Sequence, residues 1–357
     1  KNIIAGCMTV SLLLCIILVV MVTRQLRERV IEMTGELRTA LEEAKVASHA
    51  KSNFLSKMSH EIRTPMNAII GLNHIALENK NLPSITREQL KKINAAAKHL
   101  LSIINDILDM SRIESGKIVL KHEKFSFIEM LEQINVIIGS QCKDKGLNYD
   151  CRIIGEVGEF YIGDDLKLRQ VLINILGNAV KFTHKGGKVR LQVEEISTSD
   201  DKSVLQFKIA DNGVGISEEY LPKIFEAFSQ ENSNATNKYG STGLGMAITK
   251  GFVEMMSGKI SVESTKNVGT VFTVEITLTK SKDIPEENLS ENLPTAQKDL
   301  TGKIILLAED MPVNAEIMMM VLSMRQMQVD HAENGRVAVE MFAGHEPGYY
   351  DAILMDM

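Results

Sequence analysis

The N-terminal segment is the part of the sequence that most limits how this chain can fold. No residue from Ile3 to Val22 is charged, and about 20 consecutive apolar residues are what a helix needs to cross a bilayer. A signal peptide would have a shorter apolar region and a small-residue cleavage site. Here Arg24, Arg27 and Arg29 follow instead. Because positive charge stays on the cytoplasmic side, we expect a transmembrane helix over residues 1–23 and a cytoplasmic remainder.

The rest of the chain has the composition of folded globular protein. Of its 357 residues, 24% are charged and 44% hydrophobic, and the net charge is −6. Such a chain allows two or three domains, and without a basic patch it is not expected to bind nucleic acid directly. The four cysteines lack metal-binding spacing, so we expect reduced thiols. The chain opens on Lys1 and stops at Met357, and we expect it to be a piece of a longer protein.

Helical periodicity continues beyond the apolar segment. Apolar residues recur at alternating spacings of three and four, as in a coiled-coil seam. These positions are Val30, Met33, Leu37, Ala40, Ala44, Ala47, Phe54 and Met58. We therefore expect a coiled-coil helix over residues 24–47 that runs unbroken into the next segment.

A second periodic segment follows the short connection at residues 79–84. Its apolar positions are Leu90, Ile93, Ala97, Leu100, Ile104 and Ile107. Two helices with a short connection form a hairpin, which has too small a core to be stable alone. We expect a helical hairpin over residues 48–116 that dimerises into a four-helix bundle.

The remaining sequence alternates between helix and strand patterns. Helices are expected at 128–138 and 164–183, and strands at 116–127, 188–196, 203–211, 259–265 and 269–278. Mostly antiparallel strands mixed with helices in this way predict an α/β sandwich over residues 117–280. Residues 281–301 are polar and contain prolines, so they are expected to be a linker. Residues 302–357 show a βαβαβ order, the start of a doubly wound parallel α/β domain.

Several polar and glycine-rich motifs could carry chemistry. Asp211 precedes Gly213 and Gly215 at a strand end, where a carboxylate can accept a hydrogen bond from an amino group such as that of adenine. Gly243, Leu244 and Gly245 lie before a helix, a place suited to phosphates. Taken singly, these patterns are also typical of ordinary turns.

A helical motif adds two amides and a lysine. Asn174 and Asn178 lie four residues apart on one helical face, with Lys181 three residues further. Amide oxygens can bind Mg²⁺, and the lysine can neutralise phosphate charge. Alone, this pattern is also typical of a solvated polar face.

In this order, the motifs resemble those of hybrid sensor histidine kinases over nearly the whole chain. "SHEIRTPMN" looks like the histidine box, "NILGNAVKFT" the asparagine box, "DNGVGIS" and "GSTGLG" the two glycine boxes, and "IFEAFSQ" the phenylalanine box. The resemblance implies a plasma-membrane kinase that binds ATP and Mg²⁺, the metal through Asn178. Two positions in the predicted ATP lid depart from the family pattern, Asn237 and Ser241.

The resemblance implies roles for residues around the histidine box. His60 is the implied phosphate acceptor, and Glu61 is placed to take the proton from the other ring nitrogen. Pro65 would bend the helix just past the histidine. Thr64 corresponds to a polar residue that, in the family, orients water for dephosphorylation of the partner.

The last strands resemble the N-terminal part of a receiver domain. Glu309 and Asp310 form an acidic pair suited to Mg²⁺, and Asp356 is the implied acceptor for phosphate from the histidine. The partners implied are a second copy of the chain, the receiver in cis, and a downstream response regulator or histidine phosphotransfer protein. Because the receiver stops early, we expect residues after Thr301 to be mobile or only partly folded.

Two other functions compete with the histidine kinase. An ATPase of the same nucleotide-binding superfamily would share the asparagine and glycine boxes but would need neither His60 nor Asp356. A non-catalytic membrane scaffold would be expected to have lost Asn178, Asp211 or the paired glycines, all of which are present. The histidine kinase is therefore the favoured interpretation.

Overall fold

The computed structural model describes residues 2–79, 81–199, 202–231, 242–281 and 300–356. The side chains of residues 2–20, 22, 44, 48, 49, 60, 198 and 199 lie outside that description. The chain divides into two compact units, Lys1–Lys57 and Met58–Met357. The two departures from the family pattern, Asn237 and Ser241, also lie outside the described residues.

The first unit belongs to one long helix, α1 (Asn2–Glu78). The predicted coiled-coil seam is exposed at its described positions from Val30 to Phe54, with Val30 58%, Met33 67% and Leu37 71% accessible. The predicted transmembrane segment falls almost entirely on residues whose side chains are not described. Within the described part of the chain, no helix has the length and apolar character needed to span a membrane.

The second unit begins with the predicted helical hairpin. The end of α1 continues through Pro65 without a break and is followed by α2 (Ser84–Glu114). Arg87 of α2 donates hydrogen bonds to the carbonyls of Leu77 and Asn79, at 2.8 and 2.7 Å. These bonds satisfy carbonyl groups that the end of a helix leaves without helical partners. Asn73 also donates to the Leu90 carbonyl at 2.8 Å, which joins the two helices.

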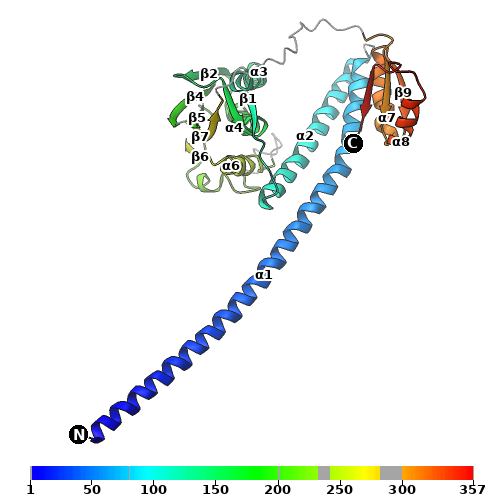
Figure 1. The fold of residues 1–357 in the computed structure, drawn as a ribbon. Coiled ribbons are helices and arrows are strands. Elements are labelled where there is room, and N and C mark those ends of the chain that lie inside the picture. The colour runs from blue at the N-terminus through cyan, green and yellow to red at the C-terminus, as the bar shows by residue number, and fades with distance from the viewer. Residues whose placement is uncertain (1, 80, 200–201, 232–241, 282–299, 357) are drawn as a thin grey trace. The chain divides into compact units, whose positions relative to one another are not determined.

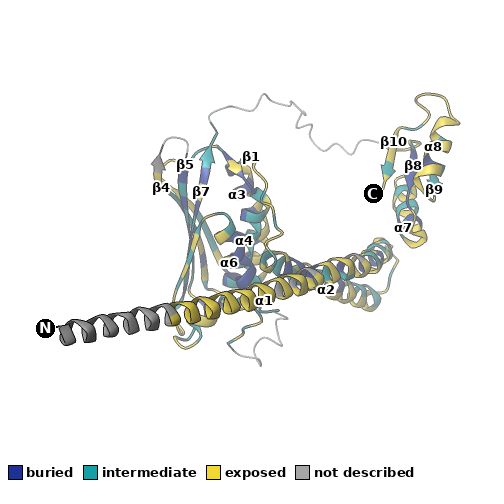
Figure 2. Cartoon of the chain, turned by 60° about the horizontal axis from the view of Figure 1, so that its bottom comes forward, coloured by how far each residue is buried: buried dark blue, intermediate teal, exposed yellow. Residues whose placement is uncertain are grey.

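The predicted α/β sandwich follows and contains a mixed sheet with helices on one face (Figure 2). Its strands are β1 (Glu123–Ser126), β2 (Asn148–Ile154), β3 (Phe160–Gly163), β4 (Lys188–Ser199), β5 (Lys202–Asp211), β6 (Lys259–Thr265) and β7 (Gly269–Lys280). Its helices are α3 (Phe127–Lys145), α4 (Asp165–Phe182), the short η1 (Leu221–Lys223) and α6 (Gly245–Met255). The strand order is β1-β3-β7-β5-β4-β2, and β6 pairs with β7. Most pairs are antiparallel as expected, but β2 runs parallel to β4.

Local sequence explains why these elements form. The Asp164 side chain caps α4 by accepting from the Lys167 amide at 3.0 Å. Apolar residues at helical spacing then bury one face of α4: Leu168, Val171, Leu172, Ile175, Leu176 and Ala179. Buried residues alternate along β5, so one side of the strand faces the helices. The resulting core extends across α3, α4, α6 and the sheet.

The C-terminal region has the predicted βαβαβ order (Figure 1). Its elements are β8 (Ile304–Ala308), α7 (Pro312–Met324), β9 (Gln328–Ala332), α8 (Gly335–Ala343) and β10 (Ala352–Met355). The strands are parallel in the order β10-β8-β9. β8 pairs with both neighbouring strands, and the expectation that this segment is mobile or only partly folded stays a prediction. The buried cluster is nevertheless small and consists of Leu306, Ala308, Ala332 and Ala338.

Candidate functional site

A cavity of about 770 Å³ lies at the end of the sandwich where β5 finishes. Its lining comes from the end of α4, the turn after β5, the start of α6 and the neighbouring strand β7, with further residues from α2. Six residues predicted from the sequence to bind nucleotide line it: Asn178, Lys181, Asp211, Gly215, Gly243 and Gly245. A volume of this size is typical of small-molecule sites.

Asp211 is the acidic group at the end of β5. Its Oδ1 accepts a hydrogen bond from the Gly213 amide at 2.8 Å, and the backbone amide of Thr270 also donates to the carboxylate. Burial raises the pKa of Asp211, and these two hydrogen bonds lower it, with a net rise. The side chain is thus a fixed, half-buried acceptor for a donor that enters the cavity.

The turn after Asp211 depends on glycine at two positions. A Cβ on Gly213 would lie 2.5 Å from the Phe182 carbonyl oxygen. Gly215 has a φ of +62°, and a Cβ there would lie 2.1 Å from the Thr265 carbonyl oxygen. Only glycine allows both the left-handed conformation and this close backbone approach. Gly213 is not among the lining residues, so its role is to shape the turn.

The two asparagines of α4 contact the start of α6. Asn174 Nδ2 lies 3.5 Å from the Gly245 carbonyl oxygen and 3.4 Å from Thr249 Oγ1. Asn178 Nδ2 lies 3.3 Å from Met246 Sδ. Asn174 does not line the cavity, whereas Asn178 does. The first amide therefore joins two helices, and the second is available to a ligand through its carbonyl oxygen.

The end of α4 presents basic groups to the cavity. Burial lowers the pKa of Lys181, because it disfavours the charged ammonium group. Lys145, at the end of α3, donates from Nζ to the carbonyls of Val180 and Lys181 at 2.7 and 2.6 Å. Burial lowers the pKa of Lys145 as well. Lys145 also lines the cavity, and the sequence reasoning missed it because no local motif connects it to α4.

The second glycine turn precedes α6. Gly243 has a φ of +72°, and a Cβ there would lie 2.9 Å from the carbonyl carbon of Phe228. Leu244 is buried, and its amide donates to Thr242 Oγ1 at 3.2 Å. Gly245 and Met246 at the start of α6 line the cavity, and the first amides of a helix have no helical partners, which suits an anionic ligand.

One contact joins this turn to α2. The Thr242 hydroxyl lies 3.4 Å from Asp106 Oδ2. Burial raises the pKa of Asp106, and the Thr242 hydrogen bond lowers it, with a net rise. Both residues line the cavity, and neither was predicted from the sequence.

The residues of the histidine box lie on a separate element. His60, Glu61 and Thr64 lie on α1. Glu61 is exposed and Thr64 is half-buried, while the side chain of His60 is outside the described part. Thr64 follows His60 by four residues, so the two share one face of the helix.

A second candidate site lies at the carboxyl ends of β8 and β10. Glu309 and Asp310 follow β8, and Asp356 follows β10. One carboxylate oxygen from each lies within 4.8 Å of the others. The strand order reverses between β8 and β10, and such a switch point is where open parallel sheets place their ligands.

These carboxylates fit a hard divalent cation. Mg²⁺ prefers oxygen ligands and is commonly held by one or two carboxylates. Glu309 is 8% accessible, and its Oε1 accepts from the Met311 amide and from Asn314 Nδ2, both at 3.2 Å. One carboxylate is thus fixed, while Asp310 and Asp356 are exposed.

Comparison with known families assigns two segments of the chain. Residues 163–280 match the family described as "Histidine kinase-, DNA gyrase B-, and HSP90-like ATPase". Residues 50–116 match the "His Kinase A (phospho-acceptor) domain". The first segment contains most of the cavity lining, and the second contains His60, Glu61 and Thr64.

Individual proteins resemble a larger part of the chain. Sensor histidine kinase AruS of Pseudomonas aeruginosa is 36% identical over 93% of this chain and 32% of its own length. Autoinducer 2 sensor kinase/phosphatase LuxQ of Vibrio parahaemolyticus is 36% identical over 91% and 38%. Signal transduction histidine-protein kinase BarA of Escherichia coli is 34% identical over 93% and 35%. The chain therefore spans about a third of the length of these curated relatives.

A solved structure shares the fold. The crystal structure of full-length ShkA in complex with AMPPNP superposes with a TM-score of 0.53 at 25% identity. The match covers 84% of this chain and 59% of that chain.

Proposed function

Since this chain belongs to the family of sensor histidine kinases, we propose that it binds ATP in the cavity around Asp211 and transfers the terminal phosphoryl group to His60. One observation carries the proposal. Asn178 and Lys181 at the end of α4 and Asp211 at the end of β5 come from two separate elements and line a single cavity within the ATPase-family segment.

The base would enter beside Asp211. The carboxylate is held by two backbone amides, so its remaining acceptor positions can receive the exocyclic amino group of adenine. Gly215 allows the neighbouring backbone to approach the flat base. This step supplies binding and orientation rather than chemistry.

The phosphates would lie toward Lys181 and the start of α6. Lys181 can neutralise phosphate charge, and the amides at the helix start can donate to phosphate oxygens. The Asn178 carbonyl oxygen would hold the Mg²⁺ that accompanies ATP, and this ion would offset the charge of the phosphates. The protein thus contributes position and electrostatics to the transfer.

The transfer requires a neutral imidazole on His60. Its ring nitrogen has a lone pair that attacks the γ-phosphorus as the bond to the β,γ-bridging oxygen breaks, and ADP leaves. Glu61, the next residue along α1, would accept the proton from the other ring nitrogen. The product is phosphohistidine.

A second transfer would carry the phosphoryl group to Asp356. The carboxylate oxygen attacks the phosphorus, and the bond to the His60 nitrogen breaks. Mg²⁺ held by Glu309, Asp310 and Asp356 would neutralise charge at that site. This assigns residues 302–357 to the N-terminal part of a receiver. Thr64 would orient water for removal of phosphate from the receiver, and the kinase/phosphatase name of LuxQ supports such a second activity.

The cellular setting is part of the proposal. The exposed apolar seam of α1 supports a homodimer, which would hold a four-helix bundle formed from two hairpins. The uncharged run from Ile3 to Val22 supports a plasma-membrane anchor with the catalytic part in the cytoplasm. Downstream, a response regulator or a histidine phosphotransfer protein would receive the phosphoryl group.

We divide the chain as transmembrane helix 1–23, signalling helix 24–47, phosphoacceptor hairpin 48–116, ATP-binding domain 117–280 and linker 281–301, followed by the receiver part.

The proposal is tested by labelling the chain with γ-labelled ATP and Mg²⁺. We expect an acid-labile, base-stable phosphate that is lost in His60→Gln. The matched control is His74→Gln, which changes an exposed histidine on the same helix and is expected to keep full labelling. Label that persists in His60→Gln would contradict the assignment of the acceptor.

The same experiment, with released phosphate measured as well, distinguishes the histidine kinase from the competing ATPase. A superfamily ATPase without histidine phosphorylation would release inorganic phosphate and leave no label on the protein. Steady phosphate release with an unlabelled wild-type chain would favour that alternative.

A further inference from the structure

Three neighbouring strands place three polar residues in one row beside the cavity. The registers pair Asp211 of β5 with Thr270 of β7, and Thr270 with Ser264 of β6. Side chains that are directly opposite in antiparallel strands lie on the same face. Asp211 and Thr270 line the cavity, whereas Ser264 does not. Ser264 therefore stands behind the two residues that a ligand can touch.

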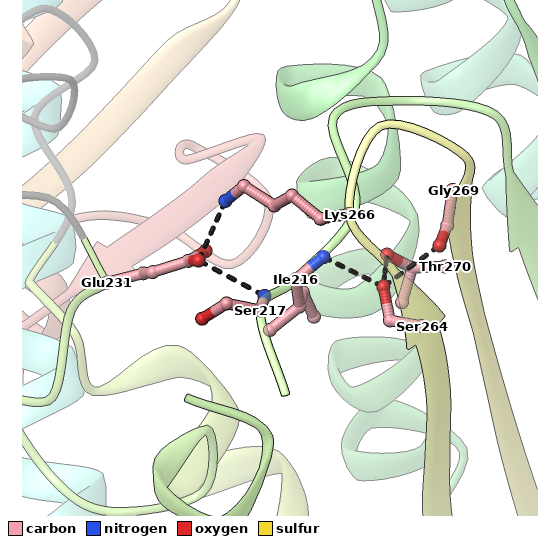
Figure 3. A network of polar contacts seen from close by, with 7 residues as sticks. All are labelled: Ile216, Ser217, Glu231, Ser264, Lys266, Gly269 and Thr270. Atoms are coloured by element: carbon pink, nitrogen blue, oxygen red, sulfur yellow. Dashed lines mark hydrogen bonds and ion pairs between the residues drawn. The ribbon is translucent and has the colours of Figure 1, made fainter. Parts of the chain in front are cut away.

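The Ser264 hydroxyl has three polar partners (Figure 3). It accepts from the Ile216 amide at 2.8 Å, lies 2.9 Å from the Gly269 carbonyl oxygen, and lies 2.9 Å from Thr270 Oγ1. A hydroxyl has one hydrogen and two lone pairs. Since the Gly269 carbonyl can only accept, Ser264 must donate its hydrogen there. Thr270 must then donate to Ser264.

This assignment fixes what Thr270 presents to the cavity. Because its hydrogen is directed to Ser264, its remaining lone pairs are acceptors. Asp211 beside it is also an acceptor when ionised. The pair would favour a base whose facing group is an amino donor, as in adenine, and disfavour guanine, which has a carbonyl oxygen at that position.

The same hydroxyl holds the turn that carries the glycines. Its bond to Ile216 joins that turn to β6, and the Val214 carbonyl accepts from the Asn267 amide at 2.7 Å. A further link lies beside it in Figure 3, where Glu231 accepts from the Ser217 amide at 3.1 Å and pairs with Lys266 at 2.7 Å. The turn after β5 is therefore hydrogen-bonded to the β6–β7 hairpin on both sides of Gly215.

We propose that Ser264 is a positioning residue for purine recognition: its hydroxyl holds Thr270 and the Ile216 turn so that the cavity accepts adenine and rejects guanine. The inference rests on the proposed function, because it concerns the base of the nucleotide bound there. Ser264 would act through Thr270 and Ile216 and would not touch the nucleotide itself.

The test measures binding of ADP and of GDP to the whole chain by calorimetry. In Ser264→Ala, Thr270 loses its fixed acceptor and can rotate to donate into the cavity. We expect ADP affinity to fall about tenfold, as for the loss of one such hydrogen bond, with GDP affinity unchanged or increased. A loss of packing alone would weaken both nucleotides to the same extent.

Three further variants make the result specific. Ser261→Ala is the matched control, because Ser261 lies on the same strand with an exposed side chain, and it should leave both affinities unchanged. Ser264→Thr keeps the hydroxyl and should keep the preference for ADP. Ser264→Cys has a similar size but a weak donor and acceptor, so it should lose the preference even where Ser264→Ala fails to fold.

The outcomes separate the inference from the proposed function. A wild-type chain that binds neither nucleotide overturns both. A wild-type chain that prefers ADP, together with Ser264→Ala and Ser264→Cys variants that keep the wild-type ratio of affinities, overturns the inference alone.

Discussion

The two sheets in the described part of the chain both have acidic residues at the ends of their strands, but they support those residues in different ways. In the sandwich, Asp211 ends a strand that is packed on one face against α4 and other helices. In the C-terminal region, Asp310 and Asp356 end strands whose buried cluster contains only four residues among those described. One site is thus part of a large core, and the other lies at the rim of a small one.

The difference has consequences for what each site can do. A half-buried acceptor with fixed hydrogen bonds can discriminate between ligands, because leaving buried polar groups unpaired costs free energy. Exposed carboxylates around an open strand end recognise charge and allow a partner to approach. We therefore expect substitutions at the sandwich site to change which ligand binds. Substitutions in the C-terminal region should act mainly by changing the stability of that region.

The largest expected effect comes from the sandwich site. Asp211→Ala and Asn178→Ala should each lower ADP affinity about 100-fold, because each removes a partner of a charged or metal-bound group. Asp356→Asn should leave ADP affinity unchanged and should keep the label on His60, because it removes only the acceptor of the second transfer. Calorimetry on the purified chain measures the first effect, and gel labelling measures the second. Full affinity in either sandwich variant would mean that the pocket is assigned to the wrong residues.

The next largest effect is expected from core substitutions, whose consequences for folding should differ between the two sheets. Leu172 and Leu306 are both essentially buried, at 0% and 1% accessible, so removing either side chain to alanine should cost about 2–5 kcal/mol. The large core should tolerate Leu172→Ala and remain folded with a lower urea midpoint. The small one should not tolerate Leu306→Ala, and amide protection in β8 should disappear while that in β5 stays.

This pair of variants also tests the relation between core size and stability. Equal residual protection of β8 and β5 in Leu306→Ala would show that the parallel ladders hold the C-terminal region without its core. Val339→Ala provides the control, because Val339 is 67% accessible and its truncation should leave protection in β8 unchanged.

Most of the elements were predictable from periodicity. The strand predicted at 259–265 and the helix predicted at 164–183 correspond to β6 and α4 within one residue. Two strands were missed, β2 and β3. In β3, four residues offer too short a run for alternation to be recognised. In β2, the central segment "DCR" is polar, and its pairing with β4 is parallel and set by tertiary contacts.

The candidate site was predictable where a motif is local. Asp211, Gly215 and Asn178 lie in short motifs, and the structure brings them to one cavity. Lys145 was not predicted, because the carbonyls to which it donates belong to a distant helix. Ser264 was not predicted, because its contact with the Ile216 amide joins residues that are 48 positions apart. The assignment of catalytic roles remains a prediction, and so do the domain boundaries.

A smaller effect is expected for cation binding at the C-terminal site. Mn²⁺ should bind the carboxylates of Glu309, Asp310 and Asp356, and Asp356→Asn should weaken that binding about tenfold through loss of one charged ligand. Electron paramagnetic resonance of Mn²⁺ in the absence of nucleotide measures it without interference from the ATP site. Glu346→Gln, a change to an exposed acid in the loop before β10, is the control. Equal affinity in Asp356→Asn would remove that residue from the site.

The smallest effect is the dependence of stability on pH, and its sign should be opposite in the two regions. Burial raises the pKa of Asp211, so stability contributed there is lost as pH rises from the unfolded value, about 3.9, through the folded one. Hydrogen bonds from Lys303 Nζ, at 2.7 Å, and from the Ile304 amide, at 2.8 Å, lower the pKa of Asp351. Its contribution is therefore present above the unfolded value and is lost as pH falls through the folded one. Asp211→Asn should gain stability relative to wild type on going from acidic to neutral pH, and Asp351→Asn should lose it. Urea midpoints followed by hydrogen exchange in β5 and in β8 measure the two trends, and trends of the same sign would contradict the contrast drawn between the sheets.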